Sequence, residues 1–145
     1  MTNAQIVDVL GGNSIFPHPI QKATDLEEQV RAGLPASTVT VLAEKLCMHR
    51  SEVAARLNIP ARTLSRRLAT SQRLTHDESD RAMRMARVVA LAQEVLGADD
   101  KAARWMVAPN RALGGDRPFD RLDTELGVRS AEEILYAIAY GMYSL

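Results

Sequence analysis

Apolar residues recur at intervals of three and four along most of this chain, a spacing typical of amphipathic helices. The pattern predicts short helices over residues 6–10 and 24–33, a helix over 39–48 and another over 50–57. A further helix begins at Pro60 or Ala61 and ends near Ala69 or Thr70. No run alternates between apolar and polar positions for long enough to predict a strand, so the predicted fold class is all-α.

Capping residues mark the helix boundaries in the second half of the chain. Residues 75–78, Thr-His-Asp-Glu, form a capping box that opens the longest helix, and Gly97 ends this helix after Leu96. Asp99 is predicted to cap the next helix, which Pro109 ends. A loop with two glycines then leads to one short helical turn after residue 118. Residues 130–133, Ser-Ala-Glu-Glu, are predicted to open the final helix, which runs to Tyr140.

Composition supports packed helices and narrows the function. Hydrophobic residues make up 46% of the chain and aromatic residues only 4%, which favours helices around a buried core. The one cysteine, Cys47, excludes an intrachain disulfide and a metal site built on several thiolates, and it is predicted to be a small buried residue. No secretory signal or membrane-spanning run occurs, so we expect a cytoplasmic protein with no membrane partner.

Charge is distributed unevenly although the formal net charge is zero. From residue 97 onward, acidic residues outnumber basic ones by eight to six. Between residues 53 and 76 there is no acidic residue, and a local excess of positive charge of this kind suits a phosphate-facing surface. The five arginines of this segment are Arg56, Arg62, Arg66, Arg67 and Arg73.

The same segment has the spacing of a helix-turn-helix unit. Two short helices flank a turn at Asn58, a residue type that tolerates the left-handed conformation. Arg62, Ser65 and Arg66 fall on the outward face of the second helix, where they are predicted to meet base edges. Arg67 and Arg73 are predicted to contact phosphates. A solvated basic face on an ordinary helical hairpin is the alternative.

Candidate catalytic groups are better explained as helix caps. His76, Asp77 and Glu78 lie in the predicted capping box, where carboxylates favour the positive end of the helix dipole. Gly114 and Gly115 are not followed by the Lys-Ser/Thr pair of a phosphate-binding loop. We therefore predict that the chain is not an enzyme and needs no metal or cofactor.

The segment from residue 97 onward specifies a shape without a catalytic constellation. It carries Trp-Met at 105–106, Pro-Asn at 109–110, Leu-Gly-Gly at 113–115, Pro118, Leu-Asp-Thr at 122–124, Gly127 and Ile-Ala-Tyr-Gly at 138–141. With these motifs and the helix-turn-helix, residues 38–145 resemble the Xre/MbcA/ParS family of toxin-binding antitoxins from bacterial type II toxin–antitoxin operons. Met106, where the family usually has leucine, and His49, where serine is common, are departures that leave the fold intact.

The resemblance implies three parts and two partners. Residues 1–36 would form an N-terminal helical region, residues 37–96 the helix-turn-helix DNA-binding domain with a long linker helix, and residues 97–145 the toxin-binding domain. Such antitoxins neutralise a RES-domain toxin, which consumes NAD⁺ or uses it as an ADP-ribose donor, by obstructing its NAD⁺ pocket. They also dimerise and repress their own operon at operator DNA. A stand-alone helix-turn-helix transcriptional regulator with a C-terminal protein-interaction domain is the alternative.

Residues of the C-terminal part are predicted to contact the toxin. The loop over 109–118 has a proline at each end and two glycines, so it can present a preorganised surface at low entropic cost. Its two arginines are predicted to face the phosphate-binding pocket that holds NAD⁺ or to pair with acidic groups of that pocket. The last three residues are predicted to plug this pocket. Apolar residues of the N-terminal helices are predicted to form a homodimer interface. The predicted toxin-binding residues are Trp105, Asn110, Arg111, Leu113, Gly114, Arg117, Tyr143, Ser144 and Leu145. For Trp105, burial as an anchor of the small C-terminal domain is the alternative.

Overall fold

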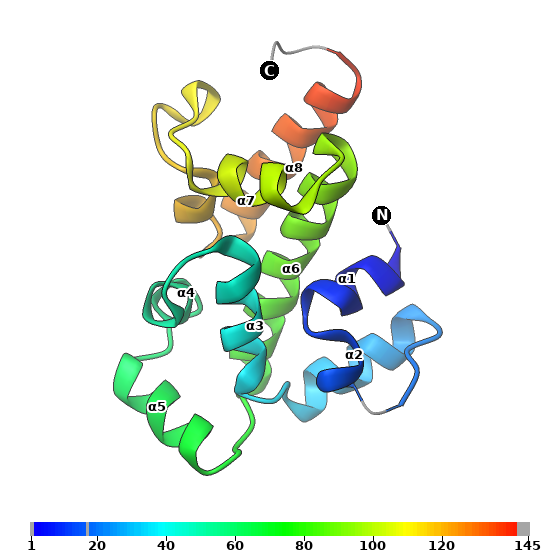
Figure 1. Cartoon of the computed structure of the whole chain (residues 1–145), viewed down its shortest axis with the longest axis vertical. Helices are drawn as coiled ribbons and strands as arrows, with labels where there is room; N and C mark the ends of the chain where they lie inside the picture. The colour runs from blue at the N-terminus through cyan, green and yellow to red at the C-terminus, as the bar shows by residue number, and fades with distance from the viewer. Residues whose placement is uncertain (1, 17, 142–145) are drawn as a thin grey trace.

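The computed structural model describes residues 2–16 and 18–141, and these ranges are helical, as predicted. Their only β-structure is an isolated antiparallel bridge between Pro35 and Arg73. No described helix is both long enough and apolar enough to cross a membrane. The central helix α6 (His76–Leu96) has neighbours on several sides (Figure 1). It contacts five helices: α1 (Asn3–Val9), α2 (Ala23–Ala32), α3 (Ser37–Leu46), α7 (Asp99–Val107) and α8 (Glu125–Ala139).

Both ends of α6 are fixed as the sequence predicts. The Oγ1 atom of Thr75 accepts the backbone N–H of Glu78 at 3.2 Å, and the Glu78 carboxylate accepts the backbone N–H of Thr75 at 2.8 Å. Gly97 ends the helix in the left-handed conformation, with φ at 83°. Most buried side chains of α6 are small or of medium size, so the neighbouring helices can approach it closely. These buried residues are Ala82, Met85, Ala86, Val88, Val89, Ala90, Leu91 and Ala92.

The N-terminal helices bury their own apolar residues against the rest of the chain. α1, the 3₁₀ turn η1 (Gly12–Ser14) and α2 cover one side of α6 (Figure 1). The expectation that their apolar residues need a second copy for burial was wrong, because one chain already buries Ile6, Val9, Leu10, Leu26 and Val30. α2 begins one residue earlier than predicted, since the Asp25 carboxylate accepts the backbone N–H groups of Gln21 and Lys22, each at 3.0 Å.

The helix-turn-helix is formed by α4 (Arg50–Arg56) and α5 (Ala61–Ala69), with α3 packed against α4. Asn58 has a φ of 58° at the turn, which confirms the left-handed position. His49 caps α4, since its side chain accepts the backbone N–H of Ser51 at 3.2 Å. The Arg81 side chain donates to the carbonyl of Leu57 at 2.9 Å and so attaches the end of α4 to α6.

The predicted burial of Cys47 was wrong. α3 ends at Leu46, and Cys47 takes the left-handed conformation with φ at 54° at the helix C-cap. This backbone turn directs the thiol outward, and the residue is exposed. The helical spacing that predicted burial applies only while the helix continues.

The C-terminal part consists of α7, two 3₁₀ turns and α8. The turns are η2 (Arg111–Leu113) and η3 (Pro118–Arg121). α8 begins at residue 125 and not at the predicted Ser-Ala-Glu-Glu box, because Thr124 is the N-cap and its Oγ1 accepts the backbone N–H of Gly127 at 3.0 Å. Ser130 lies inside the helix and donates to the carbonyl of Leu126. The N-cap of α7 is Ala98, so Asp99 is the first residue of that helix and not its cap.

Candidate nucleic-acid interface and partner-binding surfaces

The outward face of α5 presents basic and polar side chains, as the sequence predicted. Arg62, Ser65 and Arg66 are exposed, whereas Leu64 on the opposite side of the helix is 1% exposed. Across the described residues, no acidic side chain forms an ion pair with Arg62 or Arg66. Two exposed guanidinium groups and a hydroxyl on one face of the second helix suit contacts with base edges and phosphates in a major groove.

The two arginines predicted to contact phosphates have a different place in the structure. The Arg67 side chain is 14% exposed, and its guanidinium bonds to the buried Glu78 carboxylate at the start of α6. Arg73 donates to the carbonyl of Gly33 at 2.6 Å, beside the bridge to Pro35. Both guanidinium groups therefore attach the helix-turn-helix to its neighbours. Their carboxylate and carbonyl partners come from other elements, which helical spacing within α5 cannot reveal.

A cluster of charges joins the helix-turn-helix to the C-terminal part. Asp120 in η3 accepts from Arg117 at 2.8 and 3.0 Å and from Arg56 of α4 at 3.3 Å. Both guanidinium groups also lie over the Phe119 ring, at 5.8 Å for Arg56 and 5.6 Å for Arg117. Arg56 belongs to the basic segment but faces away from the α5 surface, and Arg117, predicted to face a toxin, is held within the chain. The sequence reasoning missed this junction because Arg56 is 64 residues from Asp120 in the chain, and Arg117 meets Asp120 only once the η3 turn has formed.

Replacing Asp120 with asparagine is expected to lower the free energy of unfolding by about 1 kcal/mol at pH 7, because two guanidinium groups lose a charged acceptor. The hydrogen bond from Arg117 holds the pKa of Asp120 below its ordinary value of 3.8, although burial opposes this effect. The contribution is therefore present above about pH 4 and is lost as the pH falls through the folded-state pKa. Thermal unfolding of the wild type and the variant should differ at pH 7 and converge in acid; a difference that persists in acid contradicts this assignment.

The loop over residues 109–118 is held in one conformation by its own hydrogen bonds. The Asn110 side chain accepts the backbone N–H of Ala112 at 3.0 Å, and its backbone carbonyl accepts the N–H of Gly115 at 2.9 Å. Leu113 is 4% exposed and anchors the loop, and Arg121 donates to its carbonyl at 2.9 Å. The rigidity expected from prolines and glycines thus has a hydrogen-bonded basis.

The predicted toxin-binding residues differ in their exposure. Arg111 and Gly114 are exposed, and Trp105, Asn110 and Arg117 are half-buried. Leu113 is buried, so its role is to support the loop. Tyr143, Ser144 and Leu145 lie outside the described residues.

The outer face of α8 is a second candidate surface, which the sequence reasoning missed. Leu126 is 75% exposed, Tyr136 45% and Tyr140 78%, and these are the exposed large hydrophobic residues in the described part of the chain. The sequence feature that could have predicted this surface is Thr124, which is a good N-cap residue. A helix started from that cap places all three side chains on one face.

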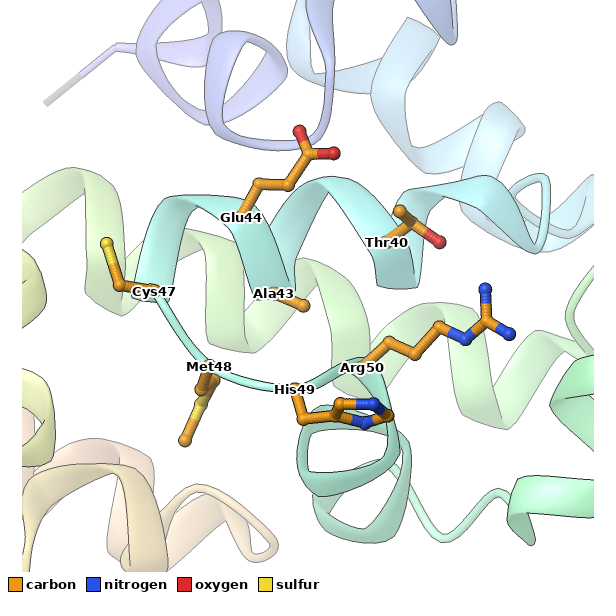
Figure 2. Close-up of a pocket in the computed structure, with 7 residues that line it drawn as sticks. All are labelled: Thr40, Ala43, Glu44, Cys47, Met48, His49 and Arg50. Atoms are coloured by element: carbon orange, nitrogen blue, oxygen red, sulfur yellow. The ribbon is translucent and has the colours of Figure 1, made fainter.

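An open groove of about 600 Å³ lies beside the turn between α3 and α4 (Figure 2). The Nδ1 atom of His49 lies 2.8 Å from the Ser51 hydroxyl, so this ring nitrogen is engaged within α4. No three potential metal ligands cluster anywhere in the ranges 2–16 and 18–141, this groove included. The lining residues are Thr40, Ala43, Glu44, Cys47, Met48, His49 and Arg50.

The fold and its surfaces define a helix-turn-helix protein with an attached helical partner-binding domain. Two family descriptions match its two parts. The "Antitoxin Xre-like helix-turn-helix domain" matches residues 25–87, and the "Antitoxin Xre/MbcA/ParS C-terminal toxin-binding domain" matches residues 91–141. The second match covers the last turns of α6, all of α7 and the 109–118 loop, and α8.

Individual relatives agree with these matches. The antitoxin Xre of Yersinia enterocolitica is 31% identical over 145 aligned positions, which cover 88% of this chain and 97% of the relative. The antitoxin Xre of Pseudomonas putida is 43% identical over 83 residues, which cover 57% of this chain and only 52% of that relative. The "Prs ADP-ribosylating antitoxin" of a Sphingobium species is 24% identical, with 79% of this chain and 78% of the relative covered. The chain belongs to the Xre family of antitoxins, with a DNA-binding and a toxin-binding domain.

Proposed function

We propose that this chain neutralises a RES-domain toxin by covering its NAD⁺ pocket with the C-terminal domain, and represses its own operon by binding operator DNA through α5. The observation that carries the proposal is the presence of both domains in one chain, with residues 25–87 and 91–141 matching the two parts of an antitoxin. The cytoplasm is the expected place of action, because both operator DNA and NAD⁺ are found there.

Operator binding is supported by the surface of α5. Arg62 and Arg66 are exposed on the face opposite the buried Leu64, and Ser65 lies between them. A helix of nine residues reads only a few base pairs, so a useful operator requires a second copy of the chain at a second half-site. Arg67 is largely buried on Glu78 and positions this helix, whereas Arg73 is exposed and stays a proposed phosphate contact.

Toxin binding is supported by the preformed loop over 109–118. A loop already fixed by internal hydrogen bonds loses little conformational entropy on binding. Arg111 is exposed on it and is proposed to pair with acidic groups of the toxin's NAD⁺ pocket. Tyr143, Ser144 and Leu145 follow α8 in sequence and are proposed to contact the same pocket.

The involvement of NAD⁺ is supported by one of the relatives. The name of the Sphingobium protein refers to ADP-ribosylation, a reaction for which NAD⁺ is the ordinary donor. A toxin that attacks NAD⁺ would be harmless while a bound protein covers its cofactor pocket. The proposed antitoxin needs no catalytic group of its own.

The test separates the two activities with the double variant Arg62→Ala/Arg66→Ala. We expect its affinity for the DNA upstream of its own gene to fall at least roughly 30-fold, because each lost base contact is worth about 1–3 kcal/mol. Growth and NAD⁺ content of cells that express the RES-domain toxin of the same operon should be protected equally by the variant and the wild type.

The matched control is Arg31→Ala/Arg104→Ala, which removes the same charge from exposed arginines on α2 and α7. Its operator affinity should stay close to that of the wild type. Unchanged operator affinity of the α5 variant would remove α5 as the recognition helix. A toxin that remains active beside the wild-type chain would remove neutralisation and leave a stand-alone regulator.

A further inference from the structure

A straight stripe of exposed side chains runs along the outer face of α8. Its members are spaced by three, four, three and four residues, the spacing that places side chains in one line along a helix. All five are exposed, and the stripe includes no residue from the opposite, core-facing side of α8. We call this surface the α8 stripe; it consists of Leu126, Arg129, Glu133, Tyr136 and Tyr140.

The fold does not require the apolar side chains of the stripe, because they do not pack into the core. The other side of α8 supplies the residues that pack into the core, with Val128, Ala131 and Leu135 fully buried. Exposed aromatic residues lose little conformational entropy on binding and are enriched at the energetic centres of protein interfaces. Among the described residues, the large exposed apolar side chains all lie on this stripe. This concentration indicates a contact surface.

We propose that the α8 stripe docks into an apolar groove on the toxin, outside the pocket that the 109–118 loop covers. This inference rests on the proposed function, because the occupant it names is the toxin. The stripe lies wholly within residues 91–141, the segment that matches a toxin-binding domain. Binding follows the helix-in-groove mode, in which apolar residues spaced along one helix face provide the anchors.

Charge on the stripe argues against a second copy of this chain as the occupant. A two-fold pairing of α8 helices that covers all three apolar residues is centred on Glu133, whether the helices run parallel or antiparallel. Each arrangement sets this carboxylate against its own copy, and like charges in apposition are unfavourable. Arg129 is already paired with Glu125 of the same helix at 3.6 Å, so Glu133 is the charge of the stripe that needs a partner. A different protein avoids the conflict by placing a cation opposite Glu133.

The size of the stripe leads to the same occupant. With 15 residues, α8 is about 22 Å long and about 10 Å wide, so the stripe covers roughly 220 Å². A stable interface buries about 800 Å² on each partner. The stripe alone is too small for that, so its occupant must contact further surface, and the exposed 109–118 loop lies in the same matched domain.

The experiment compares two triple variants of the full chain. Leu126→Ala/Tyr136→Ala/Tyr140→Ala removes the apolar anchors, whereas Leu126→Met/Tyr136→Phe/Tyr140→Phe keeps the apolar surface and serves as the matched control. The purified RES-domain toxin of the same operon is the binding probe. We expect roughly 100-fold weaker toxin binding for the alanine variant and only a small change for the control. Operator binding and thermal unfolding of both variants should match the wild type, since the side chains are exposed.

Three results would overturn the inference. One is an alanine variant that is folded and binds the toxin as tightly as the wild type. Another is an alanine variant that sediments as a monomer where the wild type is a dimer, which would assign the stripe to a second copy. Failure of the proposed function is distinct, because the wild-type chain itself would then bind no toxin. Loss of binding in both the alanine variant and the apolar control would also overturn the apolar docking.

Discussion

Replacing Gly127 with alanine is expected to lower the free energy of unfolding by about 3 kcal/mol or more and to abolish toxin binding. A Cβ atom at this position would lie 1.7 Å from the carbonyl oxygen of Arg121 and 2.6 Å from its carbonyl carbon. These are backbone atoms of η3, so no side chain can rotate away to make room. α8 would have to move off η3, and this movement breaks the packing that forms the C-terminal domain.

Urea unfolding of the purified chain measures this effect. Gly114→Ala is the control, because Gly114 has a φ of 66° but nothing within 4 Å of an added Cβ. It should cost only the strain of a left-handed alanine, about 1 kcal/mol. If Gly127→Ala were as stable as Gly114→Ala, the close approach of α8 to η3 would be contradicted.

Replacing Glu78 with alanine is expected to cost about 3–4 kcal/mol, because it leaves the guanidinium of Arg67 largely buried without its carboxylate. Glu78 is 7% exposed and also accepts the backbone N–H of Thr75, so the variant opens the capping box as well. The pair attaches α5 to the start of α6. Operator affinity should therefore fall together with stability.

Asp77→Ala provides the matched control for Glu78→Ala. Asp77 lies one residue earlier in the same first turn, is exposed, and contributes mainly through the helix dipole, worth about 0.5 kcal/mol. Chemical unfolding of both variants gives the comparison. Adding Arg67→Met to Glu78→Ala should recover part of the lost stability, because no unpaired charge then remains. Equal stabilities of Glu78→Ala and Asp77→Ala would contradict a structural role for the pair.

The two ends of the molecule are joined by charges and not by apolar contacts alone. Arg84 pairs with Glu125 at 3.0 Å, and Arg87 with Glu132 at 3.2 Å, so two carboxylates of α8 bind guanidinium groups of α6. Arg56 adds the link from α4 to η3. A toxin bound to the C-terminal domain is thus mechanically connected to the DNA-binding helices through α6 and α4.

Helix positions were predictable where a cap acts locally. Thr75, Gly97 and Asn58 have the backbone conformations that their residue types favour, and each was predicted from neighbours in sequence. The predicted start of α8 was wrong because the sequence offers two possible N-cap residues, Thr124 and Ser130. Thr124 prevails because a helix from this residue places Gly127 against η3, a tertiary contact that sequence does not display.

The candidate site was predictable in outline but not in its partners. The outward face of α5 followed from helical spacing, which fixes Arg62 and Arg66 opposite Leu64. The ion pairs of Arg67 and Arg117 did not follow from helical spacing. Arg67 meets Glu78 only in the folded chain, and Arg117 meets Asp120 only once the η3 turn has formed. The α8 stripe was not predicted either, because Leu126 and Arg129 join its helix face only when the helix begins after Thr124.

In the proposed function, this chain inhibits a toxin by covering its NAD⁺ pocket. The most direct measurement is NAD⁺ consumption by the purified RES-domain toxin of the same operon while the purified full-length chain is titrated in. We predict that consumption falls to background as the complex forms, and that high NAD⁺ concentrations weaken the inhibition because both ligands compete for one pocket. A toxin that forms the complex and remains fully active, or that forms no complex, would contradict the account.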